Sequence, residues 1–260
     1  MNRFIKDTRK YWLYAKYAAK SELKSEVASS HLNWLWWILD PLLFMLIYSF
    51  VSIVVFGKSE QYFAAFVFIG ITCWDFFSRT VKQSVKLVSG NSSVVTKIYL
   101  PKYILIYIQM LINGFKMLIS FCLVLGIMVL YRVPVSFRLL YMIPLFLTLF
   151  LVTFGISAIM LHGGVFIEDL YNVVNALLRF VFYMSGIFYS IPKRVPGIYG
   201  RLLLKVNPVA MVINGLRDAM LYSSIPDLKA LFLWMAGGLF LSVLGVTIIY
   251  KSENTYVKVI

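Results

Sequence analysis

Charged residues are scarce in this chain of 260 residues, at 14% of the sequence, and acidic ones are the scarcest, with 11 Asp and Glu against 25 Lys and Arg. Soluble proteins carry about 25% charged residues. Together with 61% hydrophobic residues, this composition excludes an ordinary soluble domain and indicates a protein that spans a lipid bilayer. The net charge of +14 does not indicate nucleic-acid binding, because Lys and Arg gather between apolar runs, as topogenic charges do.

Cysteine and histidine are also rare, with two of each. Both cysteines, Cys73 and Cys122, lie inside apolar segments, and the histidines are far apart, so we expect neither a disulfide nor a metal site. The chain has no nucleophile elbow and no HExxH motif. A GKS tripeptide at 57–59 matches the end of a phosphate-binding loop, but Ser52 stands where that loop needs its first glycine. We therefore expect this chain to bind no cofactor.

Long apolar runs predict an all-α integral membrane protein with six transmembrane helices in a single domain over residues 1–260. A helix rises 1.5 Å per residue, so about 20 residues cross a hydrocarbon core of roughly 30 Å. The expected spans are residues 34–56, 62–77, 103–130, 139–161, 171–191 and 230–250. Six spans put both termini on one side, and Lys and Arg are more numerous there, which predicts cytoplasmic termini.

The first 33 residues predict a helix that lies on the membrane surface. At 100° per residue most basic side chains fall on one side, while Phe4, Tyr11 and Trp12 fall on the other. A basic amphipathic helix with aromatic anchors lies in the membrane interface. The segment is not a signal peptide, because it has no continuous apolar core before a small-residue cleavage site.

The link between the second and third spans, residues 79–102, is polar and basic and contains no acid. Residues 80–88 predict a short helix that ends at 89–93. Two interpretations stay open: a solvated loop that only fixes topology, or a cytoplasmic helix that contacts a partner protein. Charge alone favours the first.

The longest connection, residues 192–228, predicts short re-entrant helices at the outer face. Asn207 and Pro208 form a helix start, with Asn as the cap and Pro at the first helical position. The apolar stretch that follows is too short to span and is interrupted by Arg217 and Asp218. If this stretch did span, the chain would have seven spans and an outer C-terminus.

Ionisable residues inside the spans are informative, because charges in lipid are costly and usually functional. Lys116 and Arg179 lie well inside; each either snorkels, pairs with a backbone carbonyl, or serves transport. Asp40 and Asp75 lie near span ends, and no acid lies at mid-span. An ion-coupled transporter would carry a mid-membrane carboxylate. If this chain transports, we therefore expect a partner to supply the energy.

Four segments together resemble a known family. They are WLWWILDPLLFMLIYSFV at 34–51, FIGITCWDFFSRTV at 68–81 with KIYLPKYIL at 97–105, YMSGIFYSIP at 183–192, and NPVAMVINGLRDAML at 207–221. Their order and spacing resemble the permease subunit of ABC-2-type exporters of cell-surface polysaccharides, which include O-antigen, capsule and teichoic acid exporters.

The resemblance implies a homodimeric permease in the cytoplasmic membrane of a bacterium, bound to two copies of a separate ATPase that holds ATP and Mg. It also implies a substrate carried on undecaprenyl diphosphate, and an outer gate formed by the short helices of 192–222. Many relatives have Arg where this chain has Glu168. The implied ATPase contacts are Lys16, Lys20, Lys24, Lys82, Lys86, Val88, Glu168 and Asp169.

Aromatic residues make up 17% of the chain, and some of them are candidates for a sugar route, although packing and lipid-facing roles are more common. The candidates for the channel or substrate are Phe44, Tyr48, Lys116, Arg179, Tyr183, Phe188 and Tyr189. The outer candidates for binding the diphosphate are Arg201, Lys205 and Arg217.

Two other functions stay open. The first is a drug or small-lipid efflux permease with the same architecture. The second is a membrane glycosyl- or acyltransferase, which would need a catalytic carboxylate or histidine at the membrane surface. The only candidates for that role are Asp40, Asp75 and His162, and their positions in the sequence do not form a constellation. The expected partners are the ATPase, a second copy of this chain, the lipid-linked glycan and membrane lipids.

Overall fold

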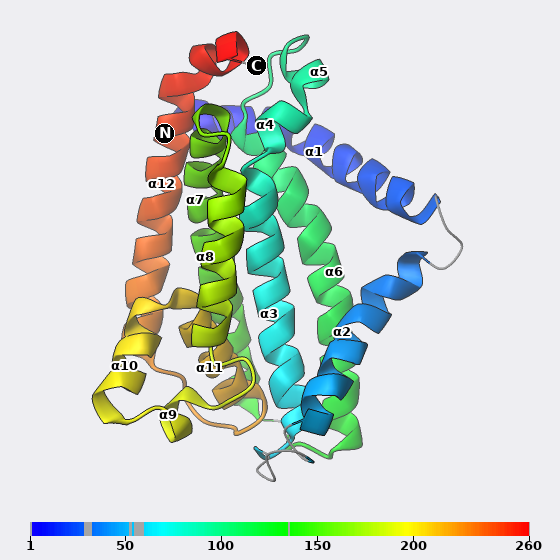
Figure 1. Cartoon of the computed structure of the whole chain (residues 1–260), viewed down its shortest axis with the longest axis vertical. Coiled ribbons are helices and arrows are strands. Elements are labelled where there is room, and N and C mark those ends of the chain that lie inside the picture. Colours follow the sequence, from blue (N-terminus) through cyan, green and yellow to red (C-terminus); the bar gives the residue numbers. More distant parts are fainter. Residues whose placement is uncertain (1, 29–32, 52–53, 55–59, 135, 260) are drawn as a thin grey trace.

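A computed structural model describes residues 2–28, 33–51, 54, 60–134 and 136–259, and within these ranges all regular structure is helical (Figure 1). The long helices are α1 (Asn2–Ala28), α2 (Asn33–Phe50), α3 (Phe63–Ser84), α6 (Tyr103–Leu130), α7 (Met142–Phe166), α8 (Leu170–Met184) and α12 (Leu228–Val259). The short ones are α4 (Leu87–Gly90), α5 (Ser92–Val95), the 3₁₀ helix η2 (Phe137–Tyr141), α9 (Ile191–Arg194), α10 (Gly197–Val206) and α11 (Pro208–Met220). The predicted all-α class is confirmed.

Four segments are long and apolar enough to cross a membrane: α3, α6, α12 and the continuous stretch of η2 and α7. The other two expected spans correspond to shorter apolar helices, Trp34–Phe50 in α2 and Leu170–Met184 in α8. The 15 residues of α8 rise about 22 Å, which is less than the roughly 30 Å of a hydrocarbon core. The GKS tripeptide and most of the predicted end of the first span lie outside the described residues.

The expected fifth span, 171–191, is shorter because the chain turns after Met184. Gly186 has φ 63°, a left-handed conformation that glycine adopts without steric cost. The chain then leads into α9 to α11, which lie at the end of the molecule opposite the two termini (Figure 1). Asn207 caps α11 by accepting hydrogen bonds from the backbone N–H groups of Val209 and Ala210, both 3.1 Å, which confirms the predicted helix start.

The separate helix predicted at 80–88 is wrong, because α3 continues to Ser84. Thr80, Val81 and Ser84 are buried, and the Thr80 side chain donates to the Phe76 carbonyl at 2.7 Å within the helix. Asn113 of α6 reaches across to the Thr80 hydroxyl at 3.0 Å. Burial against α6 therefore extends α3, and the link that follows holds α4 and α5.

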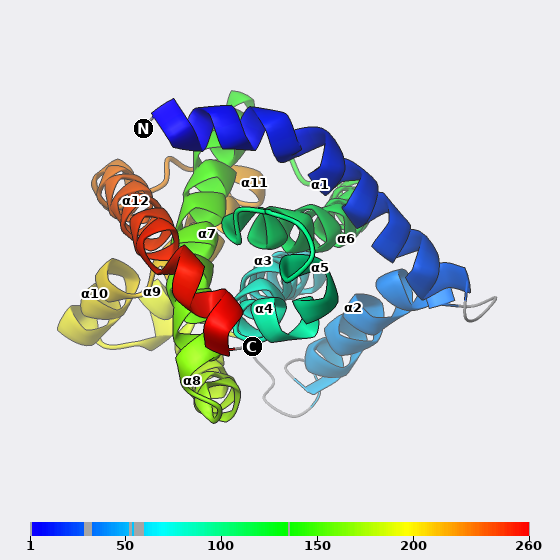
Figure 2. The ribbon, with the colours of Figure 1, turned by 90° about the horizontal axis from the view of Figure 1, so that it is seen from above.

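Helix α1 lies across the end of the bundle, as Figure 2 shows from above, where it runs past α6 toward the start of α2. Ala15 and Ala19, one turn apart, are buried and let the helix approach closely. Glu22 accepts a hydrogen bond from Gln109 at 3.2 Å. The predicted surface helix thus has one face covered by α6, while its lysines are exposed.

Small residues hold α7 and α12 together, and this is the most extensive helix pair in the described chain. A Cβ atom on Gly155 would lie 2.6 Å from the Cβ of Leu241, and one on Gly245 would lie 2.5 Å from the Cβ of Ala158. Close backbone approach at small residues is how helices associate in lipid, where burial from water gives no driving force.

Replacing Gly245 with alanine should therefore destabilise the protein. The added methyl group overlaps Ala158 and forces α7 and α12 apart, at a cost of about 1–3 kcal/mol. Gly126→Ala in α6 is the matched control, because a Cβ there meets nothing within 4 Å. Thermal unfolding of the purified protein in detergent should give a lower midpoint for G245A only; equal midpoints would contradict this packing.

Candidate functional site

Several candidate ATPase-contact residues lie together at the end of the molecule that carries both termini. Lys82 in the last turn of α3 and Lys86 just after α3 stand over the ring of Tyr171 at 5.3 and 4.4 Å. Glu168 and Asp169, just before α8, are exposed. The structure thus brings the link after α3 beside the α7–α8 turn. We call these four charged residues the corner surface.

A glycine makes the corner surface possible. A Cβ atom on Gly164 of α7 would lie 2.0 Å from the carbonyl oxygen of Val85, so a side chain there would push the two segments apart. Val88 was also expected to contact the ATPase, but it is only 1% exposed and packs inside the molecule. Lys16, Lys20 and Lys24 are exposed on α1, on another side of the molecule (Figure 2).

The two chain ends are tied together at this same end of the bundle. Arg3 forms an ion pair with Glu253 at 3.0 Å and stands 4.5 Å above the ring of Tyr250. The hydroxyl of Tyr250 donates to Asp7 at 2.9 Å. Lys102, only 2% exposed, lies nearby, and burial lowers the pKa of its ammonium while Glu253 acts in the opposite direction. The sequence alone did not predict this contact between the N-terminal and C-terminal segments.

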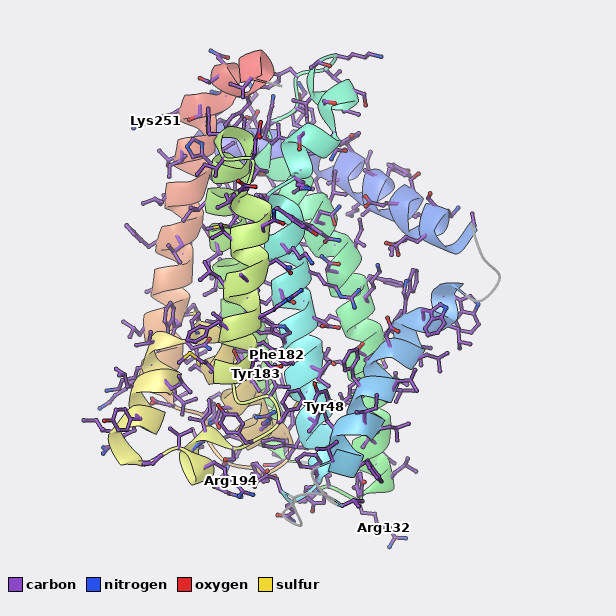
Figure 3. All side chains as sticks on the ribbon, in the orientation of Figure 1. Tyr48, Arg132, Phe182, Tyr183, Arg194 and Lys251 are labelled. Atoms are coloured by element: carbon purple, nitrogen blue, oxygen red, sulfur yellow. The ribbon has the colours of Figure 1, made fainter. Side chains whose placement is uncertain are left out.

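Four of the aromatic channel candidates, together with Phe182, form one continuous cluster between α2 and α8 (Figure 3). The rings of Tyr48 and Phe188 stack at 3.7 Å, Phe44 stacks on Tyr48 at 6.3 Å, and Phe182 meets Phe188 at 5.4 Å and Tyr183 at 5.2 Å. We call these residues the aromatic cluster. Such ring contacts contribute about 0.5–1.5 kcal/mol each beyond the burial of their area.

Two further route candidates lie beside this cluster. The hydroxyl of Tyr189 donates to the carbonyl of Tyr183 at 2.9 Å. Arg179 lines a cavity of about 420 Å³ between α3 and α8, together with Trp74 and Phe182. The cluster and the cavity adjoin one another, because the rings of Trp74 and Phe182 are 5.5 Å apart.

Lys116 lies halfway along α6 and pairs with an acid that the sequence did not single out. Its Nζ is 2.8 Å from Glu26 Oε2, near the end of α1, and 5.4 Å from the ring of Trp37. Lys116 is therefore paired with a carboxylate, and not with a backbone carbonyl. The partner could not be inferred from sequence, because α1 was expected at the membrane surface.

Arg217 was expected at the outer face as a candidate for the diphosphate, but the structure buries it. Its guanidinium donates to the carbonyls of Phe66 at 3.0 Å, Gly186 at 2.7 Å and Ile187 at 2.7 Å. Only 3% of the residue is exposed, and Gly70 leaves the space it occupies. Arg217 thus joins α11 to α3 and to the turn after α8, and each of its three guanidinium nitrogens donates one hydrogen bond.

The other two outer candidates, Arg201 and Lys205, are exposed on α10. The side chain of Arg201 donates to the carbonyl of Gly197, one turn earlier, at 3.5 Å. Arg194 lies at this same end of the molecule, opposite Lys251 (Figure 3). Arg194, Arg201 and Lys205 therefore form an exposed basic surface at this end, although Arg217 is buried.

Arg217→Met should destabilise the protein strongly, because the three buried carbonyls would lose their donor. Each unpaired buried group costs about 1–3 kcal/mol, so we expect a loss of roughly 3–5 kcal/mol. Arg201→Met is the control and should change stability by less than about 0.5 kcal/mol. Unfolding of both variants is followed by circular dichroism in detergent. If the two variants unfold alike, the structural role assigned to Arg217 is refuted.

The fold and these sites define a multi-pass helical membrane protein with charged surfaces at both ends and an aromatic cluster between α2 and α8. Residues 15–221 match the family of ABC-2 type transporters, and the chain belongs to this family. The family predicted from the sequence is thus confirmed.

Curated relatives cover nearly the whole chain. The O-antigen export system permease protein RfbA of Klebsiella pneumoniae is 24% identical over 243 residues, 92% of each protein. The protein of the same name from Myxococcus xanthus is 27% identical over 255 residues, 92% of this chain and 96% of the relative.

Proposed function

We propose that this chain is the permease subunit of an ATP-driven exporter that carries a cell-surface polysaccharide, linked to undecaprenyl diphosphate, across the cytoplasmic membrane of a bacterium. Two copies of the chain form the path, and two copies of a separate ATPase bind ATP and Mg. The observation that carries the proposal is the similarity, over nine-tenths of the chain, to permeases named for O-antigen export.

The placement of the termini supports a cytoplasmic face for the ATPase. Both ends of the chain lie at one end of the bundle (Figure 1), and the basic N-terminal helix and the link after α3 lie there too. An excess of Lys and Arg marks the cytoplasmic side of membrane proteins. In the corner surface Lys86, Glu168 and Asp169 are exposed and Lys82 is half-buried, and the surface carries both signs of charge, which suits a protein partner.

Helix α3 is the element that connects this surface to the aromatic cluster. It ends beside Lys86, and nearer its middle Trp74 meets Phe182 of the cluster. Nearer its start, the Phe66 carbonyl binds Arg217 of α11. A displacement of the corner surface would therefore reach the aromatic cluster and the short helices at the far end through one buried helix. In this proposal ATP hydrolysis drives that displacement.

Reversing the charges of Lys82 and Lys86 to glutamate should release the ATPase. Truncating one partner of a charge pair in an interface typically costs 2–5 kcal/mol, and the reversal adds repulsion, so we expect co-purified ATPase to fall by at least about tenfold. The measurement is the amount of ATPase that accompanies the tagged chain from detergent-solubilised membranes, together with the amount of chain inserted.

The matched control is the double reversal of Arg132 and Arg138, which precede α7 at the opposite end. Removing positive charge there reinforces the proposed orientation, so the chain should insert normally. Full recovery of the ATPase with the K82E/K86E chain, or equal loss in both double variants, would exclude docking at the corner surface.

The substrate class has its own test. Depleting the chain should leave undecaprenyl-linked polymer at the inner face of the membrane and remove it from the cell surface. Normal surface polymer, combined with lost efflux of a small apolar drug, would instead indicate the alternative efflux permease.

A further inference from the structure

A polar cavity of about 230 Å³ lies between the end of α1 and the helices α2, α3 and α6. Its polar wall comes from residues spaced three and four apart, which places them on one face of each helix. The residues are Thr72, Asp75 and Arg79 of α3, Asn113, Lys116 and Ser120 of α6, Asp40 of α2 and Glu26 of α1. Trp36 and Trp37 add two indole rings.

This cavity lies at the middle depth of the spanning helices. Lys116 is at the centre of the 28-residue α6, about 20 Å from its start, and Thr72 is near the middle of the 22-residue α3. Ionisable groups at such a depth are rare, and they line substrate pathways more often than they serve packing. We call it the mid-depth cavity. The expectation that Asp75 lies near a span end is therefore wrong, because α3 continues to Ser84 and Asp75 lies near its middle.

Most of the charged side chains that line the cavity belong to two ion pairs. Lys116 pairs with Glu26 at 2.8 Å, and Arg79 pairs with Asp75 at 3.4 Å. The carboxylate of Asp40 makes no hydrogen bond or ion pair with any described residue. The cavity therefore carries one negative charge in excess.

A second group points independently to a ligand. Thr72 lines the cavity and is only 3% exposed, and its hydroxyl has no hydrogen-bond partner within the described chain. An unpaired buried hydroxyl costs about 1–3 kcal/mol, which a bound polar molecule would recover. Trp36 lines the cavity and is 49% exposed, whereas the ring of Trp37 already has the Lys116 ammonium 5.4 Å from its centre.

We propose that the mid-depth cavity is a subsite for one sugar residue of the exported glycan, and that it accepts neutral and amine-bearing sugars and disfavours acidic ones. This inference rests on the proposed function and names the class of sugar. A carboxylate accepts hydrogen bonds from two sugar hydroxyls or from an ammonium group, the Thr72 hydroxyl both donates and accepts, and the indole of Trp36 covers the apolar face of the ring. The excess negative charge repels a uronic acid.

The experiment measures sugar binding to the complete complex. The chain and its co-purified ATPase are placed in lipid nanodiscs, and glucosamine, glucose and glucuronic acid are titrated separately while saturation-transfer NMR is recorded. We expect glucosamine to bind most tightly and glucuronic acid most weakly. Asp40→Asn keeps the shape and removes the charge, so the preference for glucosamine over glucose should fall about tenfold.

A second variant tests the hydroxyl. Thr72→Val should weaken all three sugars together by about fivefold to tenfold, because the hydroxyl serves every ring. Two controls lie outside the mid-depth cavity: Thr153→Val in α7, another buried threonine whose hydroxyl has no partner within the described chain, and Asp227→Asn at the start of α12. Both controls should bind the sugars as the unmodified protein does.

Three results would overturn the subsite: glucuronic acid binding best, no monosaccharide binding to the unmodified complex, or unchanged binding in both D40N and T72V. Thermal unfolding and recovery of the ATPase establish that each variant is folded. Polymer export, measured in cells depleted of the chain, is scored separately. Failure of the sugar titration with export intact removes only the subsite, whereas normal export without the chain removes the proposed function.

Discussion

The packing of α3 at the centre of the molecule is the constraint on which the other elements depend. It is the most buried of the candidate spans and contacts α2, α6, α7, α8 and α11. Two glycines set how closely its neighbours approach: Gly70 leaves room for the Arg217 guanidinium, and Gly164 of α7 lets the Val85 backbone lie against it. Because interiors are close-packed, a change at one end of α3 is felt along its length.

Buried polar groups are satisfied across elements that are distant in sequence. Arg217 supplies donors to carbonyls in the turn after α8, where the helical pattern ends and the backbone would otherwise lack partners. Glu26 neutralises Lys116 in the same way, from the end of α1. Lipid offers no water to satisfy such groups, so their partners must come from the protein. The Asp40 carboxylate and the Thr72 hydroxyl in the mid-depth cavity are exceptions, because neither has a partner among the described residues.

Charged and aromatic side chains gather in different regions of the molecule. Exposed lysines and acids gather at the end with both termini, exposed basic residues on α9 and α10 lie at the other end, and stacked rings join α2 to α8 between them. The aromatic cluster and the mid-depth cavity both border α3, and Arg79 lines the cavities on either side of it. A partner that moves the end of α3 would therefore act on both polar spaces at once.

The sequence by itself determined the helical membrane class, the family, the position of six apolar helices and the start of α11 at Asn207, because hydropathy, capping and Pro placement are local properties. Only the tertiary structure decided the continuation of α3 to Ser84, the early end of α8, the burial of Arg217 and Val88, and the pairing of Lys116 with Glu26. Each of these features depends on which segments, remote in sequence, pack together. The hydrophobic pattern of one segment does not show which other segment packs against it.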